Sequence, residues 1–266
     1  MSLFQINTNV EALKAYNALA KVNAQAAKAQ LRLASQKRIN SVADDTSGYR
    51  VGKELEAKVS VMKAAQGNIG AAKDLLATAE SALSNINDLL IQVKAKVADA
   101  NDPSKNLTAI ANDVVALGNE ISSIFTNTKF NDTALLSGTG YSSSFTFQTG
   151  VSESTTVNFG TLNTIDLSTI TGATSSSVST LNVDTIISTI QDALGSIGNY
   201  TQRFDVKNDY LTAAISNATA SVSRLFDADV ALEQLNATKA QIGSQVATAM
   251  LAQLNSQPQN ILALFR

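Results

Sequence analysis

Apolar residues recur at alternating spacings of three and four along most of this chain of 266 residues. Such a 3.5-residue repeat lines the apolar side chains along one stripe of a helix, as in coiled coils. The repeat runs through four segments, at 3–31, 55–97, 107–124 and 187–225. Helices of globular proteins average about 11–12 residues, whereas the second segment alone would extend roughly 60 Å. We therefore predict a mainly α fold of long antiparallel helices, a coiled-coil or helical-bundle rod.

Few large side chains are available to fill a thick core. Aromatic residues make up 5% of the chain and Trp is absent, although 44% of the residues are hydrophobic. Because aromatic side chains bury the most apolar area per residue, this composition favours long thin helical packing over a globule.

Residues 137–180 differ from the helical segments in composition, because 22 of these 44 residues are Ser or Thr. Within them the stretches SFTFQTG and TTVNFGT alternate apolar and polar residues and are separated by a short polar linker. Alternation with a period of two predicts strands, so we predict a small β-hairpin in the middle of the chain. The Ser/Thr-rich stretch at 168–180 is expected to be an exposed loop.

The residue types that most enzymes and metal sites use are missing. The chain has no Cys and no His, which removes thiolate nucleophiles, most zinc sites and the commonest general base near neutral pH. Two tight carboxylate pairs remain, Asp44 with Asp45 and Asp227 with Asp229, and we interpret both as loop and helix-cap chemistry. We therefore predict no catalytic residue, no cofactor and no metal site, and an enzyme is the weakest functional alternative.

The charges argue against nucleic acid as a main partner, because the net charge is −2. Residues 1–40 contain six basic side chains and a single acid, Glu11. We interpret this basic run as the solvated face of a helix, with a membrane-binding helix as the alternative. Runs of about 18 apolar residues are absent, so no membrane insertion is expected. The N-terminus also lacks a secretory signal, so the protein stays in the cytosol or leaves by a route that reads no cleavable signal.

The chain ends in SQPQNILALFR, which places four bulky apolar side chains close to its last position. An apolar chain end needs a partner, because an exposed one forms an adhesive patch. The first and last helices can cover each other on one side by packing antiparallel, but their flanks stay open. Burying these four side chains in an assembly would contribute roughly 6–12 kcal/mol gross, so we expect both chain ends to become ordered on assembly.

Several segments at both ends of the chain resemble the signature segments of bacterial flagellin. They are FQINTNVEAL (4–13), LRLASQKRINSVADDTSGYRV (31–51), NTKFND (127–132), RLFDADVALE (224–233) and QIGSQVATAMLAQLNSQPQNILALFR (241–266). The matches keep the family order and cover roughly the whole chain outside 137–180. Phe226 departs from the family, which usually has an acid at this position.

The resemblance implies a structural subunit that polymerises into the flagellar filament used for swimming. It also implies an extracellular protein that leaves through the flagellar type III export apparatus. Partners would be its own copies, an export chaperone, and junction and cap proteins. Residues 1–42 and 228–266 would pair as an inner-tube domain, and residues 43–227 would form a rod domain without large outer domains. Alternatives are a hook–filament junction-type protein and a cytosolic chemoreceptor-like signalling coiled coil.

Two groups of site residues follow from this resemblance and from the apolar ends. We expect an assembly interface made by Leu3, Ile6, Val10, Leu13, Met250, Leu254, Ile261, Leu262, Leu264 and Phe265. We expect the turn between the terminal and rod helices to be fixed by capping and charge-assisted bonds of Arg38, Asn40, Asp44 and Asp45, with Gly48 present for close packing.

A third group concerns the vertebrate Toll-like flagellin receptor. Flagellins that it detects resemble one another in a stretch of the form LQRVRELAVQA, and the aligned stretch here is LIQVKAKVADA (90–100). Gln92 stands in place of the contact Arg, Ala95 in place of Glu, and Lys96 in place of Leu. Loss of even one such anchor costs about 2 kcal/mol or more, so the resemblance implies receptor binding weaker by a factor on the order of 100.

Overall fold

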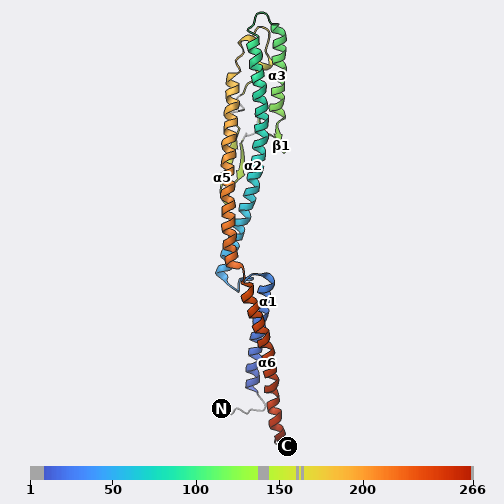
Figure 1. The fold of residues 1–266 in the computed structure, drawn as a ribbon, viewed down its shortest axis with the longest axis vertical. Helices are drawn as coiled ribbons and strands as arrows, with labels where there is room; N and C mark the ends of the chain where they lie inside the picture. Colours follow the sequence, from blue (N-terminus) through green and yellow to red (C-terminus); the bar gives the residue numbers. More distant parts are fainter. Residues whose placement is uncertain (1–8, 137–143, 160–161, 163–164, 265–266) are drawn as a thin grey trace. The chain divides into compact units, whose positions relative to one another are not determined.

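Long helices dominate the computed structural model, as the apolar repeat predicts (Figure 1). The structure describes residues 9–136, 144–159, 162 and 165–264, with side chains described up to residue 256. The long helices are α1 (Val10–Ser35), α2 (Thr46–Asp99), α3 (Leu107–Asn127), α5 (Asp184–Phe226) and α6 (Val230–Leu264). The short elements are β1 (Lys129–Phe130), β2 (Thr133–Ala134), β3 (Ser144–Gln148), β4 (Ser154–Asn158), α4 (Ser168–Thr171) and the 3₁₀ helix η2 (Val178–Thr180). The predicted mainly α fold with a small β region is confirmed.

Asparagine side chains begin two of the long helices. The Oδ1 atom of Asn9 accepts a hydrogen bond from the backbone N–H of Ala12 (3.0 Å) at the start of α1. Asn106 Oδ1 accepts hydrogen bonds from the N–H groups of Thr108 (3.0 Å) and Ala109 (3.1 Å) at the start of α3. These bonds satisfy N–H groups that have no partner within a first helical turn.

The chain divides into two compact units. One unit is built from the residues up to Ala57 and from Asn217 onward, and the other is Lys58–Ser216. Within the first unit, α1 and α6 lie side by side and antiparallel (Figure 1). The division between residues 42 and 43 and between residues 227 and 228, into inner-tube and rod domains, stays a prediction.

The second unit contains most of α2 and α5, which run antiparallel. Lys73 Nζ lies 2.6 Å from Asp205 Oδ1, and Lys94 Nζ lies 2.5 Å from Asp184 Oδ1. One ion pair therefore joins α2 to α5 near the middle of α2, and the other joins them near the C-terminal end of α2. Fully buried side chains in these helices include Ile69, Leu76, Leu83, Ile86, Leu90, Ile190, Ile197 and Phe204. They are members of the apolar stripes seen in the sequence, so these stripes form the core of this unit.

The hairpin predicted in the Ser/Thr-rich region is β3 paired with β4. The strands are antiparallel, with Phe145 opposite Val157. Phe147 packs edge-on against Phe204 of α5, with 6.3 Å between the ring centroids. One face of the hairpin therefore contributes to the core of the second unit.

A second, shorter hairpin formed by β1 and β2 was not predicted. Asn131 and Asp132 connect its strands with positive φ angles of 48° and 61°. Two consecutive positive φ angles define the type I′ turn that suits the twist of a hairpin, and Asn and Asp tolerate them well.

The expectation of an exposed loop at 168–180 is wrong for its apolar residues. Ile170 of α4 and Val178 of η2 are fully buried, and both elements pack on α3. The contact with α3 is close, because a Cβ on Gly118 would lie 2.7 Å from Ile170 Cγ2. Isolated apolar residues among many hydroxyls show no period, so nothing in the sequence indicated this packing.

Candidate functional site

The face at which α1 and α6 meet consists mainly of small residues. The large exceptions include Leu19 and Leu33 in α1 and Leu251 and Leu254 in α6, which are half-buried. A Cβ on Gly243 would lie 3.3 Å from Val22 Cγ1, so the two backbones approach closely at this level. The partly or fully covered small residues include Ala12, Ala15, Val22, Ala26 and Ala29 in α1, and Ala237, Ala240, Gly243, Ser244 and Ala247 in α6.

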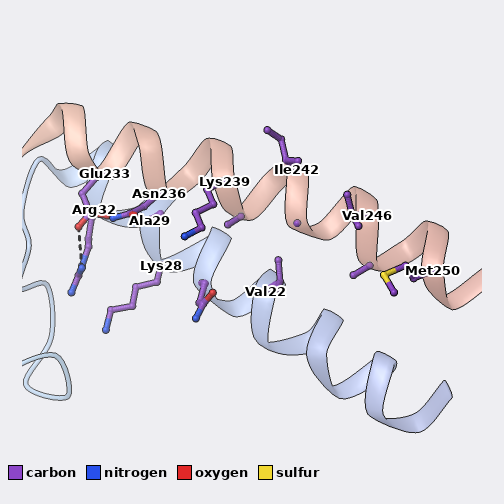
Figure 2. A pocket seen from close by; sticks show the side chains of 14 residues that line it. Val22, Lys28, Ala29, Arg32, Glu233, Asn236, Lys239, Ile242, Val246 and Met250 are labelled. Atoms are coloured by element: carbon purple, nitrogen blue, oxygen red, sulfur yellow. Dashed lines mark hydrogen bonds and ion pairs between the residues drawn. The ribbon is translucent and has the colours of Figure 1, made fainter. Parts of the chain in front are cut away.

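Large apolar side chains project from the other side of each helix. They include Val10, Leu13 and Leu31 in α1, and Leu235, Ile242, Val246 and Met250 in α6, and each is at least 47% exposed. A helix has 3.6 residues per turn, so these positions lie well away from the covered residues of the same helix, except for Met250, which lies on the flank in the same row as Gly243. Figure 2 shows this for Ile242, which projects from the side of α6 that faces away from α1. The pair therefore uses mainly small residues internally and presents most of its large ones outward.

The predicted assembly residues fall into three sets. Val10, Leu13 and Met250 are exposed in the single chain. Leu254 is half-buried, and its carbonyl oxygen accepts a hydrogen bond from Asn9 Nδ2 (3.2 Å), so this residue contacts the start of α1 in its own chain. Leu3, Ile6 and Phe265 lie outside the described residues, as do the side chains of Ile261, Leu262 and Leu264.

A groove of about 670 Å³ runs along one flank of the helix pair (Figure 2). Its apolar lining includes Val22, Ile242, Val246 and Met250, and its charged lining consists of Lys28, Arg32, Glu233 and Lys239. Arg32 Nη1 donates a hydrogen bond to Glu233 Oε1 (3.0 Å), and Glu233 is only 6% exposed. Breaking such a covered ion pair is costly because it leaves one charge without a partner. Sequence reasoning missed this pair, since its members lie near opposite ends of the chain.

Asp44 ties together the turn that follows α1. Its Oδ2 accepts hydrogen bonds from the backbone N–H groups of Asn40 (3.2 Å) and Ser41 (3.1 Å). Its Oδ1 lies 2.7 Å from Nζ of Lys28 in α1. The Lys28 ammonium, followed by the N–H of Asn40, holds the pKa of Asp44 well below its ordinary value. The ionised carboxylate is therefore part of the folded turn.

The other predicted turn residues also make local contacts within the first unit. Asp45 Oδ1 accepts a hydrogen bond from the N–H of Gly48 (2.8 Å) in the first turn of α2. A Cβ on Gly48 would lie 2.4 Å from Asp45 Oδ2 and 3.0 Å from Ile39 Cδ1, so a side chain would clash there. Arg38 Nη2 donates a hydrogen bond to the carbonyl oxygen of Leu225 (3.1 Å). What these contacts do in an assembly stays a prediction.

Phe226 fills a space that the sequence alone did not reveal. The residue is 2% exposed, and a Cβ on Gly52 would lie 2.2 Å from its Cε2 atom. Tyr49 packs edge-on against the ring (centroids 6.1 Å apart), and Lys37 Nζ lies 5.6 Å from the ring centroid. The Phe226 carbonyl oxygen also accepts a hydrogen bond from the Arg38 N–H (2.6 Å). At this position the chain relies on aromatic packing where the family pattern has a carboxylate.

Residues 90–100 match the receptor-binding pattern only at covered positions. The matching residues Leu90, Val93 and Ala100 are all buried. Gln92 and Ala95 are exposed, and Lys96 is half-buried with its Nζ 2.7 Å from Asp113 Oδ2. The three anchor positions that differ from the pattern are therefore more accessible than the positions that match it.

None of the helices in the described part of the chain is long and apolar enough to cross a bilayer. The described residues also contain no group of three or more acidic side chains that could hold a metal ion.

Comparisons with known proteins match both the N-terminal and the C-terminal parts of this chain to bacterial flagellin. The family model described as the bacterial flagellin N-terminal helical region matches residues 6–140. A second family model, described as the bacterial flagellin C-terminal helical region, matches residues 180–265. The flagellin of Bacillus subtilis is 28% identical, with 98% of this chain and 100% of that protein covered. The flagellin of Listeria monocytogenes is 30% identical, with 98% of this chain and 99% of that protein covered. Flagellin FljM of Caulobacter vibrioides is 29% identical, with 100% of each chain covered.

Proposed function

The chain belongs to the bacterial flagellin family, and from this premise we propose that α1 and α6 carry the surfaces through which its copies polymerise. The protein is a structural subunit of the flagellar filament and not an enzyme. Neither a junction-type protein nor a chemoreceptor-like coiled coil is favoured by the relatives.

The outward position of the large apolar residues is the observation that supports this interface. Leu13, Leu31, Ile242 and Val246 are each more than half exposed in the single chain. Covering one such side chain contributes about 1.5–3 kcal/mol, so covering these four contributes about 6–12 kcal/mol gross. Part of this gain is offset by the cost of ordering the partners. Copies of the chain can supply the missing cover because each presents the same uncovered residues.

The finer functional assignments are also proposals. The filament lies outside the cell, and the subunit reaches it through the type III export apparatus without a cleavable signal. An export chaperone and junction and cap proteins are its other partners. Residues 1–42 and 228–266 form the inner-tube domain of the filament, and residues 43–227 form its rod domain. These assignments are supported by membership of the family and by matches that reach both ends of the chain.

Deleting residues 256–266 tests the proposed interface. The segment removed contains Ile261, Leu262, Leu264 and Phe265, which we place in the contact between copies. We expect the shortened chain to remain soluble and helical by circular dichroism but to lose elongation of filament seeds, followed by light scattering. Val151→Ser, which changes an exposed apolar residue beside the β3–β4 hairpin, is the control and should elongate normally. Normal elongation by the shortened chain would show that its C-terminal residues are not part of the interface.

A further inference from the structure

We propose that Phe226 and Gly52 form a size-matched joint that holds α1 and α6 in the direction that polymerisation requires. This role rests on the proposed function, and it concerns residues that position the contact surfaces without belonging to them. The joint is defined as residues 36–38 after α1, residues 49–52 in the first turns of α2, and residues 226–229 from the end of α5 to the start of α6. All of them belong to the first unit.

The linker after α1 is bonded to the linker after α5. The N–H of Arg38 donates a hydrogen bond to the carbonyl oxygen of Phe226 (2.6 Å). The N–H of Ala228 donates one to the carbonyl oxygen of Gln36 (2.9 Å), which completes an antiparallel bridge between the two segments. Beyond the bridge, α1 and α6 pack along each other. A change of direction at the joint therefore moves the two helices together.

The Phe226 ring fills a space that exists only because residue 52 is glycine. A Cβ at position 52 would lie 2.2 Å from Cε2 and 2.4 Å from Cζ of the ring, which is closer than carbon atoms can approach without a shift. The ring has little room to move aside, because Phe226 is 2% exposed and Tyr49 packs edge-on against it. The fit therefore depends on the ring on one side and on the missing side chain on the other.

Phe226 couples this fit to the start of α6. Its ring contacts α2, while its carbonyl oxygen accepts the hydrogen bond from the linker after α1. Only residues 227–229 separate it from α6. Asp229 Oδ1 caps that helix by accepting hydrogen bonds from the N–H groups of Ala231 (3.0 Å) and Leu232 (3.1 Å). A short linker that is bonded at both ends leaves little freedom, so the position of the ring determines how α6 begins.

The direction of α1 and α6 matters because a growing filament end offers its partners in one arrangement. A copy whose joint is displaced binds only during the fraction of time in which the joint returns to that arrangement, and its apparent affinity falls by this fraction. Forcing an extra methyl group into a filled space disfavours the original arrangement by a factor of roughly 10–100. Overfilling the joint should therefore weaken polymerisation although the surfaces that meet are unchanged.

The competing explanation is that the pair only contributes packing to the fold of the monomer. In that case a change in the pair would reduce elongation only as far as it reduces the amount of folded monomer. A positioning pair instead alters the concentration at which fully folded chains elongate. The two explanations can therefore be separated by measuring helical content and elongation on the same variants.

A double-mutant cycle tests the size match. Gly52→Ala places a methyl group against the ring. Gly67→Ala, at an exposed position of α2 where a Cβ would meet nothing within 4 Å, is the matched control for the higher helix propensity of alanine. Phe226→Leu removes the atoms at the positions of Cε2 and Cζ, which are the two closest to the added methyl group. Phe226→Ile lacks the same atoms and provides a second background.

The critical concentration for elongation of filament seeds is the readout, with helical content checked by circular dichroism. We expect Gly52→Ala alone to keep its helical content and to raise the critical concentration by roughly 10–100-fold, because the competent joint is populated less. Gly67→Ala should leave the critical concentration unchanged. In the Phe226→Leu and Phe226→Ile chains, adding Gly52→Ala should cause no such rise.

Several results would overturn the role of the joint. A rise of equal size in all backgrounds, or in none, would show that positions 52 and 226 are not matched in size. Loss of elongation in both smaller backgrounds regardless of Gly52→Ala would show that the ring acts otherwise than through its size. Loss of helical content by Gly52→Ala in proportion to its lost elongation would reduce the pair to packing within the monomer. Failure of the unmodified chain to elongate seeds would count instead against the proposed function.

Discussion

At the scale of single residues, Asp44 shows how one carboxylate can hold a turn. It accepts hydrogen bonds from the backbone at residues 40 and 41 and pairs with Lys28 of α1. These contacts favour the ionised form and lower the pKa of Asp44 in the folded chain. A carboxylate with a lowered pKa stabilises the fold fully above its ordinary value of about 4, and this contribution is lost as pH falls toward the folded value.

Replacing Asp44 by Asn should therefore weaken the fold in a pH-dependent way. At pH 7 we expect Asp44→Asn to lower the free energy of unfolding by about 1–3 kcal/mol, because hydrogen bonds to a charged group are lost. The difference should shrink progressively below about pH 4, where the unmodified chain loses the same contribution. Urea unfolding of the monomer at a series of pH values measures this. Asp192→Asn, at an exposed position of α5, is the control and should change little. A difference that stays constant with pH would contradict the role of the charge.

The contacts of Phe226 and Arg32 show which residue-level features a sequence does not disclose. The Asp44 turn could be predicted, since its partners at 40 and 41 are close in sequence. Phe226 packs on Gly52, and Arg32 pairs with Glu233, and in both cases the partners are far apart along the chain. Without the fold nothing in the sequence connects them, so the sequence could only show that Phe226 departs from the family pattern.

At the scale of helices, the existence and type of the long elements were predictable because the repeat continues over many turns. The side of α1 that meets α6 was not. The apolar repeat of α1 includes Val10, Leu13 and Leu31, and these residues turn out to face outward. The inner face uses mainly alanines, which are common on every side of this helix. Apolar periodicity identifies a stripe that needs cover, but it does not say whether the cover comes from the same chain or from another.

The exposed residues of the stretch 90–100, at the C-terminal end of α2, allow a prediction about receptor recognition. Because the residues that match the family pattern are buried, packing within the second unit is enough to explain them. The exposed Gln92 and Ala95 and the half-buried Lys96 lack the anchor side chains of that pattern. We expect binding to the Toll-like flagellin receptor to be weaker by a factor on the order of 100 than in a variant carrying Gln92→Arg, Ala95→Glu and Lys96→Leu.

Receptor binding by the monomer, compared between these two chains in a direct binding assay, would measure this factor. Gln92→Ala is the control, and it should leave binding unchanged if Gln92 is not an anchor. Replacing Lys96 also removes its ion pair with Asp113, but an exposed pair of this kind contributes only about 0–1 kcal/mol to stability. Tight binding by the unmodified protein would show that its recognition does not depend on the three anchors.

At the scale of the whole molecule, the two units differ in how completely their apolar residues are covered. In the second unit, Ile69, Leu76 and Leu83 are fully buried along α2. In the first unit, α1 and α6 meet mainly through small side chains, and most of their large ones remain exposed. Burial stabilises by about 25 cal/mol per Å² of apolar surface, so the helix pair gains much less from its own contact than the second unit gains from its core. We expect assembly to remove this difference by covering the exposed large side chains of α1 and α6.

Hydrogen exchange of the monomer and of the filament should reveal this difference directly. In the monomer we expect the amides of α1 and α6 to exchange much faster than those of residues 69–90 of α2, because a weakly packed helix pair opens locally at low free-energy cost. In the filament the exchange of α1 and α6 should slow by several orders of magnitude, since each covered apolar side chain adds about 1.5–3 kcal/mol to the cost of opening. Residues 69–90 serve as the internal control, and their exchange should change little because their core side chains are already covered in the single chain. Equal protection of α1, α6 and residues 69–90 in the monomer would mean that the contact between α1 and α6 is sufficient by itself, and that folding of the chain ends is not coupled to assembly.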